Sequence, residues 1–211
     1  MLPRSNRSGV GQAWVCRSEK KGQSGSMPTG KIILLNGASS SGKSSIARSV
    51  QAKIEAPFWH ISIDHLRDAG VLPSTRIRSG EFKWADLRRA FFSGFEDSLV
   101  AYARAGNNLI VEYIIEDGES LQRLGEILKG MDVFFVGIHC LLNELERREI
   151  ARGDRPVGDA RRDHDAVHRH CVYDFELDGM LPPDANAEKL ISFWRRRNLP
   201  SALENLALGE T

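Results

Sequence analysis

The protein has 211 residues, enough for one α/β domain with a substantial hydrophobic core but short for a second full domain. Its 29 basic and 28 acidic residues give a net charge of +1, so no overall field attracts nucleic acid, and no apolar stretch approaches the roughly 20 residues that span a membrane. Three widely spaced cysteines, Cys16, Cys140 and Cys171, fit free thiols in a reducing compartment, and we expect a cytoplasmic protein.

The first 29 residues are rich in serine, glycine and basic residues and show no apolar period. They also lack the continuous apolar segment of a secretory signal. Such a segment buries too little surface to offset the entropy of ordering, so we expect a disordered extension over residues 1–29. Met27 would then be the natural start of the protein. A transit peptide is the alternative, because Glu19 is the only acidic residue in this segment.

From residue 30 onward, apolar strand patterns alternate with helical ones. Strands are expected over 31–36, 58–64, 108–115, 133–140 and 172–177. Helices are expected over 43–55, from Leu87 to about Gly106, over 121–128, over 144–152 with Asn143 and Glu146 as a capping pair and Gly153 at the end, and over 187–196. This alternation predicts an α/β fold with a parallel sheet between helical layers. We expect the domain to cover 30–198 and a C-terminal tail to follow over 199–211.

The stretch GASSSGKS at residues 37–44 matches G-x-x-x-x-G-K-[ST] between an expected strand and an expected helix. Gly37 and Gly42 permit backbone angles that turn successive N–H groups inward to bind an anion. The helix that begins near Lys43 adds the positive end of its dipole. Lys43 can reach the β and γ phosphates, and the Ser44 hydroxyl can bind Mg²⁺. The expected nucleotide-binding residues here are Gly37, Ala38, Ser39, Ser40, Ser41, Gly42, Lys43, Ser44 and Ser45.

Two carboxylates lie where a parallel sheet presents groups to its ligand. Asp64 comes at the end of the second expected strand, so its carboxylate could accept the proton of an acceptor hydroxyl. A helix cap is the alternative role for Asp64. Glu112 lies inside an apolar strand, where an uncompensated charge is costly. A role at the Walker-B position, contacting Mg²⁺ through its bound water, accounts for Glu112, and a structural ion pair is the alternative.

An arginine-rich segment follows the fourth expected strand. Arg148 and Arg152 are four residues apart on one helix face, and Arg155 follows the break at Gly153. Guanidinium groups can bind phosphate oxygens in pairs, and a loop that carries them can close over a nucleotide. We therefore expect a lid over about 148–170, with Arg148 at the nucleotide and Arg152 and Arg155 near the transferred phosphoryl group. The alternative is a solvated helix paired with Glu144, Glu146 and Glu149.

Two further groups of side chains could have a functional role. The aromatic residues Phe82, Trp84, Phe91 and Phe92 could form the floor of an apolar acceptor site, with core packing favoured for the last two. His164, His168 and His170 lie near Cys171 at spacings that suggest a metal site. No second cysteine lies nearby, so an ordinary polar helix is favoured for these histidines.

Several blocks of the sequence together resemble the chloramphenicol phosphotransferase family over residues 31–178. They are IILLNGASSSGKSSIARSVQ, ISIDHLRDA, LIVEYI, DVFFVGIHC, ERREIARGDRPVGDA and VHRHCVYDFELD. The resemblance implies a P-loop kinase fold with a five-stranded parallel sheet and an arginine-bearing lid. It implies transfer of the γ-phosphoryl group of ATP, with Mg²⁺, to a hydroxyl of a small molecule. The family's proposed catalytic aspartate falls on Asp64 and its lid arginines on Arg152 and Arg155.

The chain departs from the family in two places. Glu112 and Tyr113 stand where the namesake has paired aspartates. This difference concerns the expected role of Glu112 at the Mg²⁺ ion. Residues 66–90 differ, and since they should line the acceptor pocket, the acceptor need not be chloramphenicol.

The leading hypothesis is an ATP-dependent small-molecule O-phosphotransferase, with an antibiotic-resistance role if the acceptor is chloramphenicol-like. A kinase for a nucleoside, a sugar or a nucleic-acid end is the alternative within this class. A nucleotide-binding regulatory module without such activity is the alternative from another class. The expected partners are ATP and a small hydroxylated acceptor, with no nucleic acid and no membrane, and self-association stays open.

Overall fold

The computed structural model describes residues 28–153 and 157–209. Arg155 and almost all of the expected N-terminal extension therefore lie outside the described residues. The strands are β1 (Ile32–Asn36), β2 (Phe58–Ser62), β3 (Asn108–Tyr113), β4 (Val133–His139) and β5 (Phe175–Asp178). The described strands form one parallel sheet in the order β2-β3-β1-β4-β5, which confirms the predicted parallel α/β architecture.

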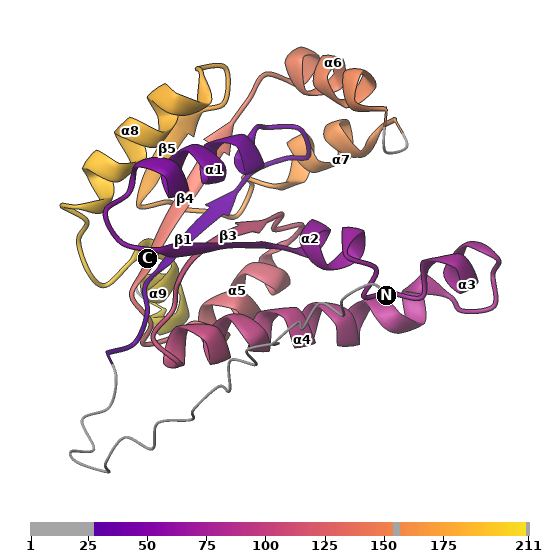
Figure 1. Ribbon diagram of the computed structural model, residues 1–211, viewed down its shortest axis with the longest axis horizontal. Helices are drawn as coiled ribbons and strands as arrows, with labels where there is room; N and C mark the ends of the chain where they lie inside the picture. The colour runs from indigo at the N-terminus through magenta and orange to yellow at the C-terminus, as the bar shows by residue number, and fades with distance from the viewer. Residues whose placement is uncertain (1–27, 154–156, 210–211) are drawn as a thin grey trace, which may run out of the picture.

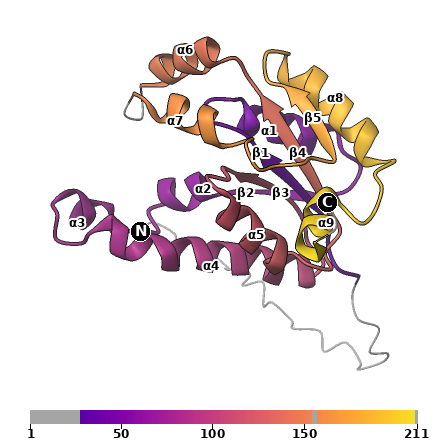
Figure 2. The same ribbon diagram turned by 180° about the vertical axis from the view of Figure 1, so that it is seen from behind.

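Helices connect the strands and cover both faces of the sheet. They are α1 (Lys43–Lys53), α2 (Ile63–Asp68), α3 (Ser74–Arg78), α4 (Trp84–Arg104), α5 (Gly118–Ile127), α6 (Leu142–Arg152), α7 (Asp159–Ala166), α8 (Pro183–Trp194) and α9 (Ala202–Leu208). Helices α1 and α8 lie on one face, whereas α4, α5 and α9 lie on the other (Figures 1 and 2). In the described part of the chain, no helix combines the length and apolar character that crossing a bilayer requires.

The central strand β1 supplies both halves of the core. Successive strand side chains point to opposite faces, so Ile33 packs with Val50 of α1 and Trp194 of α8. Leu34 faces the other way and packs in the cluster that includes Leu99 of α4. Every residue of β1 is buried, which explains why this strand reads as a continuous apolar run.

The strand order places a crevice at the carboxyl end of β1. The strand lies between β3 and β4, so the chain leaves the sheet toward opposite sides at this point. Ligands of open parallel sheets bind at such a switch point. The glycine-rich loop follows β1 directly, and α6 and α7 lie near the same end of the sheet (Figure 1).

Two element boundaries differ from expectation at the site itself. The second strand ends at Ser62 rather than at residue 64, because the Ser62 hydroxyl accepts the N–H of His65 at 3.1 Å and caps α2. Asp64 therefore lies in the first turn of a helix. Helix α6 begins at Leu142, and Asn143 accepts the N–H of its neighbour Glu144 at 2.8 Å instead of opening the helix.

The expected C-terminal tail is also different in the structure. Residues 202–208 form α9, and Leu203 is 2% exposed within the core cluster beside α5. The Ser201 side chain caps this helix by accepting the N–H of Glu204 at 3.2 Å. The core therefore extends beyond residue 198, because the apolar positions of this short helix complete the layer that covers the sheet.

Candidate active site

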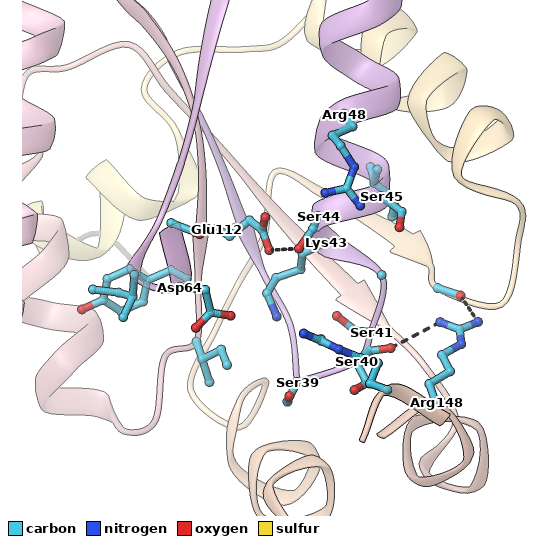
Figure 3. A pocket seen from close by; sticks show the side chains of 18 of the residues that line it. Ser39, Ser40, Ser41, Lys43, Ser44, Ser45, Arg48, Asp64, Glu112 and Arg148 are labelled. Atoms are coloured by element: carbon cyan, nitrogen blue, oxygen red, sulfur yellow. Dashed lines mark hydrogen bonds between the residues drawn. The ribbon is translucent and has the colours of Figure 1, made fainter. Parts of the chain in front are cut away.

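A cleft of about 770 Å³ opens at the carboxyl end of the sheet. The loop after β1, the start of α2, the end of β3 and the helix α6 all contribute to its walls (Figure 3). Lys43, Asp64, Glu112, Arg148 and Arg152 line this one cleft. The structure therefore brings together, from the loop after β1 and from α1, α2, β3 and α6, nearly all of the described residues that the sequence predicted for the site. Arg155 lies outside the described residues.

The loop after β1 has the backbone that a phosphate-binding loop needs. Gly42 has a φ of 99°, a left-handed conformation that favours glycine, and it directly precedes α1. A Cβ on Gly37 would lie 2.8 Å from the carbonyl oxygen of Ile138, so a side chain cannot be accommodated there. The first hydrogen bond of α1 runs from Ile46 N–H to Gly42, which leaves the preceding N–H groups at the positive end of the helix. These features fit a bound triphosphate.

Lys43 is 7% exposed and lies against its own loop. Its ammonium group donates to the carbonyl oxygens of Gly37 at 2.6 Å and Ala38 at 2.8 Å. The side chain thus holds a positive charge beside the anion-binding backbone. That position agrees with the charge-neutralising role that the motif predicts.

A chain of hydrogen bonds runs from the loop into the sheet. The Ser44 hydroxyl donates to Glu112 Oε2 at 2.9 Å, and Glu112 Oε1 lies 2.5 Å from His60 Nε2 (Figure 3 shows the first contact). Burial by itself raises the pKa of Glu112, but the His60 hydrogen bond and the Lys43 charge outweigh burial and hold the pKa below its usual value. Glu112 is therefore ionised, and its carboxylate with the Ser44 hydroxyl offers the oxygen ligands that suit Mg²⁺.

Asp64 projects into the cleft from the first turn of α2 (Figure 3). The alternative role as a helix cap is wrong, because Ser62 caps this helix. Asp64 Oδ1 lies 3.2 Å from Nη1 of Arg67, one helical turn later.

The arginines of α6 differ in the groups that they contact. Arg148 donates to the carbonyl oxygens of Ser40 at 3.4 Å and Gly179 at 3.0 Å, so it contacts the backbone of the phosphate loop (Figure 3). Arg152, in the last turn of α6, lines the cleft. Arg147 and Arg148 both form an ion pair with Glu144, each at 2.7 Å, as the solvated-helix alternative predicted for this run.

Glu149 is buried, whereas this alternative expected a solvated side chain. Its carboxylate is 4% exposed and accepts the N–H groups of Gly158 at 2.9 Å and Ala160 at 2.8 Å. Glu149 therefore binds the start of α7 to α6. The two helices of the expected lid pack against each other through this contact.

Sequence reasoning missed three residues of the site. His60 and His65 flank Asp64, and Asp163 of α7 accepts the N–H of Ser39 at 3.1 Å while being 3% exposed. The two histidines could have been noticed in the sequence, because they lie on either side of the candidate catalytic aspartate in the stretch HISIDH. Nothing in the sequence distinguishes Asp163, because it is one of many charged residues in a polar helix.

A second hollow of about 600 Å³ adjoins the cleft, since Phe92, Ile114 and Glu116 line both. Trp84 also lines it, whereas Phe91 packs against Trp84 with ring centroids 5.7 Å apart. Trp84 and Phe92 therefore occupy positions that suit an acceptor site. Phe82 instead lies under the guanidinium of Arg76, 4.1 Å from it.

The histidines near Cys171 do not gather around a common point. Among the described residues, the group whose ligand atoms could hold a metal is His60, His65 and Glu112. His168 instead bonds to the hydroxyl of Tyr173 at 2.6 Å. The sequence analysis overlooked the histidine pair beside Asp64.

Comparisons with known proteins agree with this geometry. The protein Rv2636 of Mycobacterium tuberculosis (strain H37Rv), named for a proposed O-phosphotransferase activity, is 35% identical over 177 residues, 74% of this chain and 78% of the relative. Two solved structures resemble the fold. The APS kinase CysC of M. tuberculosis, in complex with AMPPNP and APS, has a TM-score of 0.61 and 23% identity over 80% of this chain and 99% of that one. A gluconokinase from Sinorhizobium meliloti has a TM-score of 0.58 and 19% identity over 88% and 99%.

These likenesses confirm the predicted P-loop kinase fold. The sequence model of chloramphenicol phosphotransferase-like proteins matches residues 30–195, which is most of the described domain. The resemblance read from the sequence blocks is thereby confirmed, and the chain belongs to the chloramphenicol phosphotransferase-like family.

Proposed function

We propose that this protein is an ATP-dependent O-phosphotransferase that moves the γ-phosphoryl group to a hydroxyl of a small molecule. The observation that carries the proposal is the shared cleft in which the phosphate loop with Lys43 meets the Asp64 carboxylate. Membership of the family and the kinase fold support the reaction class. Chloramphenicol-like compounds are candidate acceptors.

The nucleotide would lie along the loop over residues 37–45. Backbone N–H groups of the loop and of the first turn of α1 bind phosphate oxygens. Lys43 adds a positive charge to the β and γ phosphates, and Arg148 holds the loop from outside through the Ser40 carbonyl. Each donor is already oriented by the fold, so little reorganisation is needed when charge develops during transfer.

Ser44 and Glu112 would hold Mg²⁺, since the hydroxyl and carboxylate lie 2.9 Å apart at the edge of the loop. The bound ion neutralises phosphate charge. Glu112 keeps the Ser44 hydroxyl oriented by accepting its hydrogen bond, and His60 fixes the other carboxylate oxygen. The direct contact between Glu112 and Ser44 supports a role at the metal over a purely structural ion pair.

Asp64 acts as the base in this proposal. The acceptor hydroxyl gives its proton to the carboxylate while its oxygen forms a bond to the γ-phosphorus, and the bond from that phosphorus to the β-phosphate oxygen breaks to release ADP. Arg152 and Arg155 neutralise charge on the phosphoryl group in transit. The hollow lined by Trp84 and Phe92 receives the apolar part of the acceptor.

The test is a panel of hydroxylated compounds incubated with the purified full chain and Mg-ATP. Chloramphenicol, aminoglycosides, macrolides, nucleosides and sugars are compared by ADP release and by the mass of the product. One class should give acceptor-dependent ADP release and a phosphorylated product, and Lys43→Ala should abolish both. Nucleotide affinity without acceptor-dependent release across the panel would instead support the regulatory alternative.

A further inference from the structure

Two histidines and a glutamate converge beside the phosphate loop. His60 lies on β2, Glu112 on the neighbouring strand β3, and His65 in the first turns of α2. One ligand atom from each lies within 4.8 Å of the other two. The ring centroids of the two histidines are 4.6 Å apart, and His60 Nε2 lies 2.5 Å from Glu112 Oε1.

The local fold explains why these residues meet. Ser62 of β2 pairs with Glu112 of β3 across the parallel strands, so their side chains lie on the same face of the sheet. His60 is two residues before Ser62, and its side chain therefore lies on that face too. The chain then turns directly into α2, whose cap at Ser62 binds the N–H of His65. This turn places the His65 ring beside the His60 ring.

We propose that His60, His65 and Glu112 bind a borderline transition-metal cation of the Zn²⁺ or Co²⁺ type, separate from the Mg²⁺ of the nucleotide. Two imidazole nitrogens and one carboxylate oxygen form a three-ligand set of the kind that holds Zn²⁺ and leaves a further position open. Mg²⁺ prefers oxygen ligands, so the two histidines select against it.

The ligand atoms need only small shifts to reach metal-binding distances. Zinc bonds to nitrogen and carboxylate oxygen measure about 2.0–2.2 Å, which places ligand atoms roughly 3.3 Å apart in a tetrahedral site. His60 and Glu112 are nearer than this because they are hydrogen-bonded to each other, so the two atoms must separate slightly to admit the ion. His65 is exposed, so its ring can rotate inward without disturbing the core.

The remaining carboxylate oxygen of Glu112 accepts the Ser44 hydroxyl, so the proposed ion lies next to the position of the nucleotide's Mg²⁺. Binding of the cation itself does not depend on the proposed phosphotransferase activity. It therefore can be tested without an acceptor and without turnover.

The experiment uses the full chain, without a histidine tag, freed of metal by a chelator and titrated with Co²⁺. Visible absorption reports the coordination of Co²⁺, and equilibrium dialysis with Zn²⁺ gives the stoichiometry. One ion should bind per chain. His65→Ala should weaken binding at least about 10-fold, since even outer partners of metal ligands cost that much.

Two further variants keep the result interpretable. His60→Gln retains a donor toward Glu112 but lacks the imidazole, so it should fold normally and still lose the ion. His170→Ala removes an exposed histidine outside the cluster and should bind as the parent does. Absence of one-to-one binding, parental affinity in His65→Ala, or an equal loss in His170→Ala would each overturn the assignment.

Discussion

Asp163 Oδ2 accepts the backbone N–H of Ser39 at 3.1 Å, so helix α7 is bonded directly to the phosphate loop. The carboxylate is 3% exposed, and its other oxygen accepts the guanidinium of Arg162 at 2.9 Å. Ser39 is itself 4% exposed, so its N–H has little access to water. Helix α7 therefore stabilises one conformation of the phosphate-loop backbone.

Asp163→Ala should weaken nucleotide binding. The substitution leaves a buried N–H without its acceptor, which costs about 1–3 kcal/mol, and the loop relaxes to recover that bond. A drop of about 10-fold in affinity for Mg-ATP, measured by calorimetry, is expected. Asp163→Asn retains an acceptor oxygen and should recover part of the loss. Asp165→Ala, an exposed neighbour on the same helix, is the matched control, and an equal effect there would count against the contact.

Asp64→Asn should separate binding from chemistry. The amide cannot take the acceptor's proton, so phosphoryl transfer should fall by about 10²–10⁴-fold while Mg-ATP affinity stays near the parental value. Single-turnover assays with the acceptor found in the panel measure the first quantity, and calorimetry measures the second. Asp97→Asn, an exposed acid on α4, should retain full activity. Transfer by Asp64→Asn at the parental rate would show that Asp64 is not the base.

Acid should destabilise the protein through His168. Burial and the neighbouring His139 lower the pKa of His168 to about 4, and its Nδ1 lies 2.6 Å from the Tyr173 hydroxyl. Tyr173 also accepts from Asn36 at 2.8 Å, so its own proton points to the neutral imidazole. As pH falls below about 6.5, the unfolded chain binds a proton at this histidine before the folded chain does. The free energy of unfolding should therefore decline between about pH 6.5 and pH 4.

His168→Gln tests this assignment, because glutamine can accept the Tyr173 hydrogen bond and does not titrate. Urea unfolding at a series of pH values should show a shallower decline for the variant over the same interval. A variant slope equal to that of the parent would place the acid sensitivity elsewhere.

Helix α9 should contribute measurably to stability. Leu203 is 2% exposed in the core cluster, so Leu203→Ala should lower the free energy of unfolding by about 2–5 kcal/mol through lost burial and the cavity left behind. Chemical denaturation measures this change. Leu208→Ala, at the 45% exposed end of the same helix, should change stability by less than about 0.5 kcal/mol. Similar values for the two variants would mean that α9 is not part of the core.

Local patterns determined much of this protein. The apolar run over 32–36 and the glycine-rich loop after it could be read directly, because burial on both faces and a positive φ at Gly42 each leave a signature in neighbouring residues. The parallel sheet followed from the alternation of strands and helices. Asp64 and Glu112 could be nominated because carboxylates stand out beside apolar strands.

Tertiary structure alone decided which distant residues meet. Asp163 contacts Ser39 across 124 positions in the sequence, and His60 contacts Glu112 across 52. Strand order and register create these pairs, and no local period encodes either one. The same reason applies to α9, since so short a segment carries too little local pattern to predict a helix, and only the folded core shows where Leu203 is buried.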